Sequence, residues 1–391
     1  MTDTALPVPQ PTPQAAPERQ AFLDEPVSEV GDLSQWTLMR IRFSKNKLAM
    51  IGLWGMIVIY IVVFLGAFIA PNEYTFQDAQ YVFGPPSPIT FIGPNGQLGL
   101  RPYVYATTTV LDQAKFMFVF TVDKTQKIPI QFFVHGDPVN VLWFKTNLHL
   151  FGLENTKQRF YVFGADGLGR DMFARVLVGG QISTTVGLLG VALSIVFGSI
   201  LGTASGYWAG IIDDIMQRII EVLGAFPQVP LWAALAAAMP PISSNFTVVH
   251  RYFLITVVLS VIGWTGLARQ LRAKVLSYRT ADFTQAALAA GSSDIRIILT
   301  HMVPNAASHI IVTAALAIPS MILGETALSF LGLGILPPAV SWGALLKDAQ
   351  QVSVVLDHPW ILIPALAVVL TVLLFSLLGD GLRDAVDPYS I

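Results

Sequence analysis

The residues VLVGGQISTTVGLLGVALSIVFGSILGTASGYWAGII, from Val176 to Ile212, contain no Asp, Glu, Lys or Arg. About 20 consecutive apolar residues are enough for a helix to cross the hydrocarbon core of a bilayer. This stretch is therefore long enough to span a membrane, and it indicates the fold class. Within it Gly198, Gly202 and Gly206 recur every fourth residue, which predicts a helix face that another helix approaches closely.

The composition places the whole chain in the same class. Of the 391 residues, 53% are hydrophobic and 12% are charged, and the mean hydropathy is +0.61. Soluble domains carry roughly 25% charged residues, so this chain has too few charges for a soluble enzyme of its length. The net charge of −2 gives no basic surplus for nucleic acid. The lack of cysteine excludes disulfides, zinc–thiolate sites, iron–sulfur clusters and cysteine nucleophiles.

The sequence predicts six membrane spans. Besides the stretch quoted above, the expected spans are Leu48–Ala70, Val222–Val249, Tyr252–Ala268, Met302–Gly334 and Pro359–Gly379. An even number of spans places both termini on the same side. The bases Arg40, Arg42, Lys45 and Lys47 precede the first span, and bases also prevail in the loop after the fourth. The positive-inside rule therefore places both termini in the cytoplasm.

The remaining segments divide the chain into four expected parts. Residues 1–33 are rich in Pro, Gln and acids and are expected to be a disordered cytosolic tail. Residues 34–70 hold the first span, preceded by a stretch that is either an amphipathic segment along the membrane surface or a simple basic anchor. Residues 71–170 are expected to form a β-rich extracytoplasmic insertion, with strands at 102–110, 115–123 and 127–135. Residues 171–391 form the five-helix transmembrane core.

A cytoplasmic loop, residues 271–305, contains the sequence ADFTQAALAAGSSDIRIILTHMVP over residues 281–304. One helical face in it is mostly alanine, so another surface can approach closely: Phe283, Ala286, Ala287 and Ala290. Gly291 suits the left-handed position that ends a helix, Asp294 suits the first turn of the next helix, and Pro304 marks where this second helix should end or bend. The sequence predicts two short exposed helices that meet at a glycine and fit a partner's groove.

This loop resembles the EAA loop of permease subunits in bacterial binding-protein-dependent ABC importers. The family pattern is Glu-Ala-Ala, a glycine, an apolar residue, a His or Arg, and a Pro. Its counterparts here are Gln285, Ala286, Ala287, Gly291, Ile295, His301 and Pro304, preceded by Asp282 and Phe283. Gln285 departs from the usual Glu, which removes a salt bridge from that position but not the docking of the loop.

Four further segments resemble permeases of the dipeptide/oligopeptide/nickel group: 36–53, 163–183, 325–346 and 379–388. The first of them looks like the amino-terminal part of the second permease type of this group. The resemblance covers about residues 34–70 and 163–391, and it does not cover the insertion at 71–162.

The resemblance implies an all-α polytopic membrane protein of six transmembrane helices, with the insertion between spans one and two. Such a permease pairs with a second homologous permease subunit to form a pore in the bacterial inner membrane. Two ABC ATPase subunits, which bind ATP and magnesium, attach to the cytoplasmic loop, and a periplasmic or lipid-anchored substrate-binding protein delivers cargo. This chain itself would hold no cofactor or metal and perform no catalysis. The insertion would either contact the binding protein or cover the partner permease as a lid.

The expected cargo is a di- or oligopeptide, and the same machinery also imports oligosaccharides, opines or nickel. An ion-coupled secondary transporter is the alternative from a different class, and it requires paired intramembrane charges or broken helices in repeated halves. An exporter core is a second alternative, which lacks a glycine-hinged loop of this kind.

Three other features each allow a functional and a structural interpretation. Glu325 lies within an apolar stretch, where it either lines the translocation path or bonds to nearby groups at the external end. Arg218 and Glu221 have the spacing of a helical ion pair. The run GADGLGRD at 164–171 lacks the Gly-Lys-Ser/Thr ending of a nucleotide loop, so we expect a turn that holds the entry of a helix.

Overall fold

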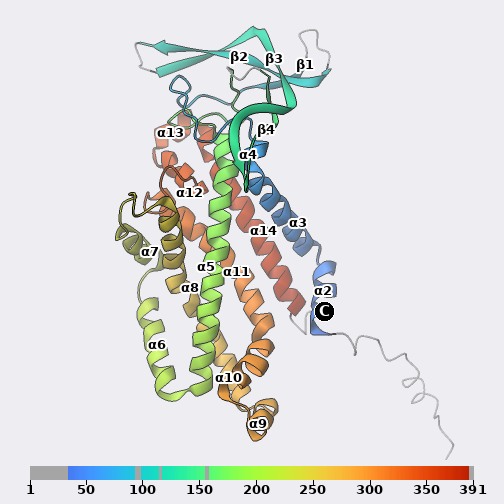
Figure 1. Cartoon of the computed structure of the whole chain (residues 1–391), viewed down its shortest axis with the longest axis vertical. Coiled ribbons are helices and arrows are strands. Elements are labelled where there is room, and N and C mark those ends of the chain that lie inside the picture. Colours follow the sequence, from blue (N-terminus) through green and yellow to red (C-terminus); the bar gives the residue numbers. More distant parts are fainter. Residues whose placement is uncertain (1–33, 93–97, 114–116, 155–157, 387–391) are drawn as a thin grey trace, which may run out of the picture.

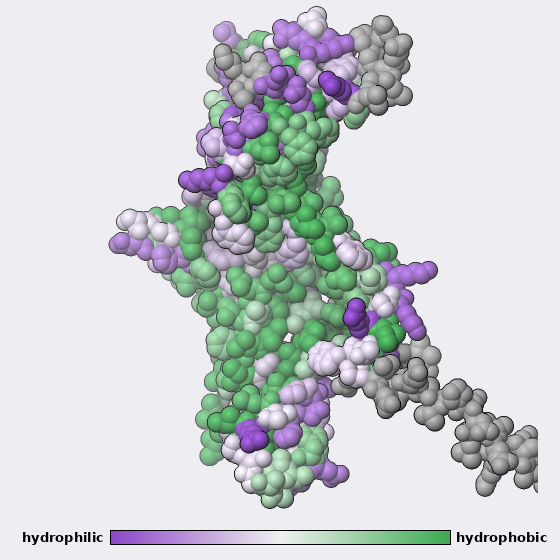
Figure 2. Space-filling view, turned by 45° about the vertical axis from the view of Figure 1, so that its right-hand side comes forward, coloured by the Kyte–Doolittle hydropathy of each residue, from purple (hydrophilic) through white to green (hydrophobic). Residues whose placement is uncertain are grey.

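The computed structural model describes residues 34–92, 98–113, 117–154 and 158–386. Long helices form a bundle, and a small antiparallel sheet lies at one end of it (Figure 1). Hydrophobic residues cover the middle of the face shown in Figure 2, while polar residues gather at the sheet end and near the opposite tip. This distribution is that of a polytopic membrane protein. The expected tail, residues 1–33, lies outside the described residues.

Among the described residues, five helical runs are long and apolar enough to cross a membrane. They are α3 (Lys47–Phe64), α5 (Met172–Trp208), α8 (Val248–Arg279), α10 (Asp294–Ile297) continued by α11 (Val303–Phe330), and the run that ends with α14 (Ile363–Val386). Four shorter helices flank these runs on the chain: α2 (Gln35–Lys45), α4 (Gly66–Ile69), α12 (Trp342–Leu345) and α13 (Val352–Asp357).

The expected third span, Val222–Val249, is not a single helix. The chain instead forms α6 (Gly210–Gly224) and α7 (Gln228–Ala237), which are bent by 85° relative to each other. The bend falls at Pro227, because a proline ring does not fit inside a helix and disfavours helical geometry at the preceding residue. The described part of the chain therefore has five candidate spans, or six if the bent pair crosses as one broken span.

The glycine repeat in α5 forms a close helix contact, as its spacing predicts. A Cβ atom added at Gly198, Gly202 or Gly206 would lie within 3 Å of a backbone oxygen of α8. The tightest approach is at Gly202, whose added Cβ would lie 2.5 Å from the carbonyl oxygen of Ala268. Any side chain larger than hydrogen would push the two helices apart, so α5 and α8 depend on these glycines for their packing.

The first and last membrane helices also lie against each other. An added Cβ at Gly52 of α3 would lie 2.8 Å from the carbonyl oxygen of Leu374, and one at Gly381 of α14 would overlap Ala49. Asn46 accepts hydrogen bonds from the first amides of α3 and donates to Asp384, 3.3 Å away. The C-terminal segment GDGLRDAVDP thus packs on the start of the first span, as far as Val386.

The insertion between α4 and α5 is a sheet of four antiparallel strands in the order β1-β2-β3-β4. The strands are β1 (Ile89–Ile92), β2 (Leu98–Asp112), β3 (Met117–Val141) and β4 (Phe144–Leu153). The two strands expected at 115–123 and 127–135 are one strand, and the first two residues of the first prediction, 115 and 116, lie outside the described residues. The polar run between them does not end the strand, because Tyr105 pairs with Lys127 and Ala106 with Asp123, so the residues between bulge out.

Because aromatic residues alternate along the expected strands of the insertion, many of them are expected in its core, but they contribute less to it than this. Phe132 and Phe133 are 65% and 62% exposed. The buried cluster consists mainly of aliphatic side chains together with one aromatic from the following segment: Val104, Ile130, Leu153 and Phe160. A sheet with one face against the bundle leaves its other face exposed, so alternation alone did not show which aromatics face inward.

Candidate functional site

The tip of the bundle opposite the sheet carries α9 (Asp282–Ala289), which is connected directly to α8 (Figure 1). The predicted loop 271–305 is therefore shorter than expected, because α8 continues to Arg279 and takes up its first residues. Thr280 ends α8, and its hydroxyl donates to the carbonyl oxygen of Ser277. The exposed part of the loop is reduced to one short helix and a turn.

Two residues of α9 attach it to the bundle. Thr284 is fully buried and its hydroxyl donates to the carbonyl oxygen of Tyr278 at 2.8 Å. Ala287, 9% exposed, packs into a small hydrophobic cluster with Tyr207, Val275, Ile297 and Met302. The expected outward face included Ala287, and this part of the prediction is wrong: the small side chain is needed so that α9 can lie closely on its own protein.

Gly291 follows the end of α9 and has φ +74°, the left-handed conformation expected for it. No described atom lies within 4 Å of a Cβ added there, so backbone geometry and not space requires glycine. The amide of Gly291 donates to the carbonyl oxygen of Leu288, and the amide of Ser292 donates to that of Ala287. These bonds satisfy the last carbonyl groups of α9 and reverse the chain direction.

Most of the predicted loop residues lie on the exposed side of this turn. Asp282, Gln285 and Ala286 are exposed, Phe283 is 37% exposed, and Ile295 is 64% exposed. The rings of Phe283 and His301 have centroids 6.4 Å apart, and Phe283 also contacts Tyr278. The tip thus presents an apolar and aromatic surface, which we call the α9 surface: Phe283, Ala286, Leu288, Ile295 and His301.

Gln285, which stands where the resembled family has Glu, makes a bond that a carboxylate cannot make. Its side-chain amide donates to the carbonyl oxygen of Arg279 at 3.0 Å. Arg279 is the last residue of α8, where carbonyl groups lack helical partners. Gln285 therefore joins α9 to the end of α8.

The second expected helix does not end at Pro304. After α10 the chain passes through one π-helical turn, Ile298–Met302, and continues directly into α11, so that Asp294–Phe330 forms one membrane-crossing run. Pro304 occupies the first turn of α11, where a missing amide hydrogen costs little, and the wider π turn before it accommodates the ring. The α9 surface is consequently attached to the start of a membrane helix and not to a free loop.

Asp294 links this region to the end of α5, a contact that the sequence did not predict. Its carboxylate accepts hydrogen bonds from the Tyr207 hydroxyl at 2.8 Å and from the Trp208 indole at 3.3 Å. Both donors are at the last turn of α5, far away in the sequence. Three long helices, α5, α8 and α11, therefore meet at the base of the α9 surface.

A second polar link joins α6 to α8 nearby. Asp213, 8% exposed, accepts two hydrogen bonds from the Arg272 guanidinium, each at 2.5 Å, and another from the Ser205 hydroxyl. The expected ion pair of Arg218 with Glu221 is also present at 2.7 Å, but both side chains are exposed, so it contributes little.

Glu325 is fully buried at the sheet end of α11. Ser183 of α5 donates to one carboxyl oxygen at 2.9 Å, and Ser329 donates to the other at 2.6 Å. Each serine oxygen also accepts a hydrogen bond from a backbone amide after α11: Ser183 from Trp342, and Ser329 from Ile335. Both carboxyl oxygens are thus hydrogen-bonded to nearby serines, and Glu325 links α5 to the end of α11.

The run 164–171 forms a turn at the start of α5. Asp166, 2% exposed, accepts from the amides of Leu168 and Arg170 and from the Arg170 guanidinium at 2.8 Å. Asp171 caps α5 by accepting from the Phe173 amide, and it accepts from Asn72 at 2.8 Å. Burial raises the pKa of the Asp171 carboxyl to about 7. The turn therefore positions the helix through two buried carboxyl groups.

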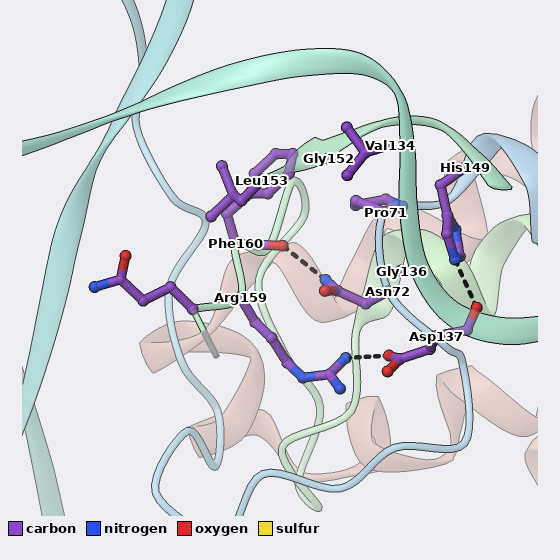
Figure 3. Close-up of a pocket in the computed structure, with 11 residues that line it drawn as sticks. Pro71, Asn72, Val134, Gly136, Asp137, His149, Gly152, Leu153, Arg159 and Phe160 are labelled. Carbon is purple, nitrogen blue, oxygen red and sulfur yellow. Dashed lines mark hydrogen bonds and ion pairs between the residues drawn. The ribbon is translucent and has the colours of Figure 1, made fainter. Parts of the chain in front are cut away.

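Hydrogen bonds and an ion pair join the segment after α4, the strands β3 and β4, and the segment after β4 (Figure 3). Asn72 donates to the carbonyl oxygen of Phe160 at 2.7 Å, and Arg159 forms an ion pair with Asp137 at 2.7 Å. The buried ring of His149 lies between two carbonyl oxygens, with Nδ1 2.6 Å from that of Ala70 and Nε2 2.9 Å from that of Asp137. The bend of β3 is thus held against the end of the first span.

Comparison with known proteins identifies the family. Residues 194–389 match the binding-protein-dependent transport system inner membrane component, and residues 34–86 match the N-terminal TM domain of oligopeptide transport permease C. The oligopeptide transport system permease protein OppC of Haemophilus influenzae is 40% identical over 245 residues, which cover 62% of this chain and 75% of that protein.

Two further relatives extend the comparison. The glutathione transport system permease protein GsiD of Escherichia coli is 39% identical over 60% of this chain and 75% of its own length. OppC of Bacillus subtilis is 30% identical over 91% of this chain and 90% of its own length. An alignment of that extent must run into the insertion, which the resemblance in the sequence had left uncovered. The chain belongs to the family of binding-protein-dependent transport system inner membrane components, with the amino-terminal domain of oligopeptide transport permease C.

Proposed function

We propose that this chain forms one half of the translocation pore in an ATP-driven importer of di- or oligopeptides. The observation that carries the proposal is the exposed α9 surface, seated on the ends of α5, α8 and α11 by buried residues and hydrogen bonds. A motor that moves such a surface displaces three membrane helices together. This task requires shape and packing, and it does not require reactive groups.

The proposed complex contains a second homologous permease, two ATPase subunits that bind ATP and magnesium, and a substrate-binding protein outside the membrane. The names of the relatives, which transport oligopeptides and glutathione, support a peptide cargo. Oligosaccharides, opines and nickel remain the alternative cargoes. The insertion, whose His149 contacts the carbonyl oxygen of Ala70 at the end of the expected first span, is the proposed contact for the binding protein.

The proposed orientation places the α9 surface in the cytoplasm and the sheet outside. The basic residues Arg40, Arg42 and Lys45 belong to α2, which precedes the first span at its end away from the sheet (Figure 1). The positive-inside rule places this end in the cytoplasm. With α6 and α7 counted as one broken span, both termini lie in the cytoplasm. We also propose that Glu325 holds the segment after α11 against α5 and does not contact cargo directly.

A co-purification experiment tests the coupling role of α9. The chain is expressed with the genes that neighbour it, extracted in detergent and captured by an affinity tag, and the ATPase subunits recovered with it are measured. We expect recovery with the wild type and a loss of at least about tenfold with Gly291→Glu, because a side chain at φ +74° strains the turn that positions α9.

Gly291→Asn is the matched control, since asparagine tolerates the left-handed conformation better than other residues and should retain most of the ATPase. Equal loss in both variants would show that glycine has another role. If the folded wild type recovers no ATPase, the importer proposal fails, and ion-coupled transport should be tested instead.

A further inference from the structure

A polar cavity lies at the sheet end of the bundle, beside the turn 164–171. Its volume is about 470 Å³, within the range typical of small-molecule sites. Three segments enclose it: the turn 164–171, the segment after α11, and the 3₁₀ segment Leu346–Gln350 with the start of α13. Five charged residues line it: Asp166, Arg170, Arg175, Lys347 and Asp348.

Arg175 is the buried basic residue among those that line this cavity. Its side chain is 7% exposed, and its Nε lies 3.2 Å from the Asp166 carboxylate without the alignment of a hydrogen bond, so this atom has no hydrogen-bond partner among the described residues. Among the described residues, its guanidinium forms one hydrogen bond, and this bond is long: 3.4 Å from Nη1 to the carbonyl oxygen of Tyr74. A buried guanidinium with unused donors is costly unless a ligand or water satisfies it.

The cavity also carries a surplus of positive charge. Asp166 is already occupied by Arg170 and by two backbone amides. Lys347 is exposed at the rim and forms no ion pair with any carboxylate that the structure describes. Burial, together with the nearby Asp166, raises the pKa of the Asp348 carboxyl, which favours its uncharged form. The cavity therefore holds three basic residues but only two carboxyl groups. One of these, Asp166, is already hydrogen-bonded, and burial favours the uncharged form of the other, Asp348.

We propose that this cavity binds the carboxylate of the cargo on the extracytoplasmic side, as the free C-terminus of a di- or oligopeptide. The inference rests on the proposed function, to which it adds a contact site. Guanidinium and ammonium groups are the side chains that recognise a carboxylate by charge-assisted hydrogen bonds. The remaining wall is apolar, with Phe83, Leu336 and Val354, and can accept the side chains of a small peptide.

The position of the cavity would let an occupant act on the membrane helices. Ser329 lines the cavity and donates to Glu325, and Arg175 belongs to the first turn of α5. The other end of α5 holds Asp294, and α11 begins directly after the α9 surface. A ligand between the external ends of these two helices is thus connected by two continuous helices to the coupling tip.

The absence of cysteine from the chain permits a direct test. Gln351, exposed at the rim, is replaced by Cys, and the full complex with its ATPases and binding protein is placed in lipid nanodiscs. The rates of labelling by an anionic and a cationic methanethiosulfonate are compared. Leu356→Cys, on an exposed residue outside the cavity, is the matched control. We expect the ratio of the anionic to the cationic labelling rate to be severalfold higher at position 351 than at position 356. Lys347→Gln should reduce this ratio at position 351, and Lys347→Arg should retain it.

The second arm uses alanyl-phenylalanine and its C-terminal amide as probes, with the binding protein left out. The free acid should protect the thiol at 351 from labelling, and the amide should protect it several times less. Equal protection by both peptides, or none by either, overturns the proposal. Protection by peptide-free binding protein alone also overturns it, because the cavity would then be a docking site.

One control separates this inference from the proposed function. ATP hydrolysis by the wild-type complex is measured with peptide-loaded binding protein. If hydrolysis is stimulated but the free acid gives no protection, the cavity assignment fails and the importer function stands. If hydrolysis is not stimulated by any peptide, the proposed function fails, whatever the labelling rates show.

Discussion

The two ends of the bundle are stabilised by different means. At the sheet end, three carboxyl groups that are almost fully buried, those of Asp166, Asp171 and Glu325, each accept two or more hydrogen bonds. At the α9 end, the short helix has only two buried residues, and exposed apolar side chains surround them. The difference fits a sheet end that is a fixed assembly and an α9 end that, as proposed, makes contact with another protein. Substitutions should therefore lower stability at the first end and impair coupling at the second.

The largest effect on stability is expected for Glu325→Ala. The substitution leaves the hydroxyls of Ser183 and Ser329 buried with one partner fewer each, and it opens a cavity between α5 and α11. We expect a loss of about 3–5 kcal/mol, seen as a lower unfolding temperature in detergent. Glu325→Gln keeps the volume and one acceptor oxygen, so its loss should be smaller. Wild-type stability in the Ala variant would mean that water enters and satisfies the serines.

The second prediction concerns pH at the same end. The folded state raises the pKa of Asp171 from 3.8 to about 7, so between these values the folded protein binds a proton that the unfolded chain has released. The group therefore favours folding at low pH, and this contribution disappears as pH rises toward 7. Between pH 5 and pH 7 the change amounts to at most ~3 kcal/mol. Asp171→Asn, which can still cap α5, should flatten the pH dependence of the unfolding temperature; an unchanged slope would assign the titration to another group.

Sequence patterns predicted local features of both ends well. The four-residue repeat of Gly198, Gly202 and Gly206 predicted a close helix contact, because small residues at that spacing lie on one helix face. The position of Gly291 after an apolar helical run predicted its positive φ. Pro227 was a visible helix breaker, but the absence of charge from Val222 to Val249 led to the prediction of one span there.

Contacts between distant segments could not be predicted in the same way. Asp294 meets Tyr207 across 87 residues, and Asp213 meets Arg272 across 59, and a single sequence carries no signal for the register between two helices. Phe132 and Phe133 are both exposed although neighbours in a regular strand point to opposite faces, and Phe133 has φ +57°, so the strand is irregular at a point that alternation does not indicate.

The third prediction tests the α9 end through its link to α5. Asp294→Ala removes the acceptor for Tyr207 and Trp208 but leaves Thr284 and Ala287 in their buried positions. The unfolding temperature should change little, since the lost bonds contribute about 1–2 kcal/mol at a partly exposed site. ATPase recovery should persist, while peptide-stimulated transport per ATP hydrolysed should fall severalfold. Asp294→Asn keeps an acceptor oxygen and is the control. Loss of ATPase recovery with Asp294→Ala would place Asp294 in the docking surface and not in the link behind it.

The smallest effect is expected at Gln285, where this chain departs from the family pattern that it resembles. Gln285→Glu replaces the amide donor to Arg279 with a carboxylate that repels the same carbonyl oxygen, and Gln285→Ala removes the donor without adding charge. Because the side chain is exposed, water can replace the lost bond, and each variant should lose less than about 1 kcal/mol of local stability. The amount of ATPase retained at increasing salt measures the effect. Similar retention by both variants supports a role confined to the joint between α8 and α9. A severalfold loss with Glu but not with Ala would instead show that the ATPase meets residue 285 directly and rejects a negative charge there, which would extend the α9 surface to that side of the helix.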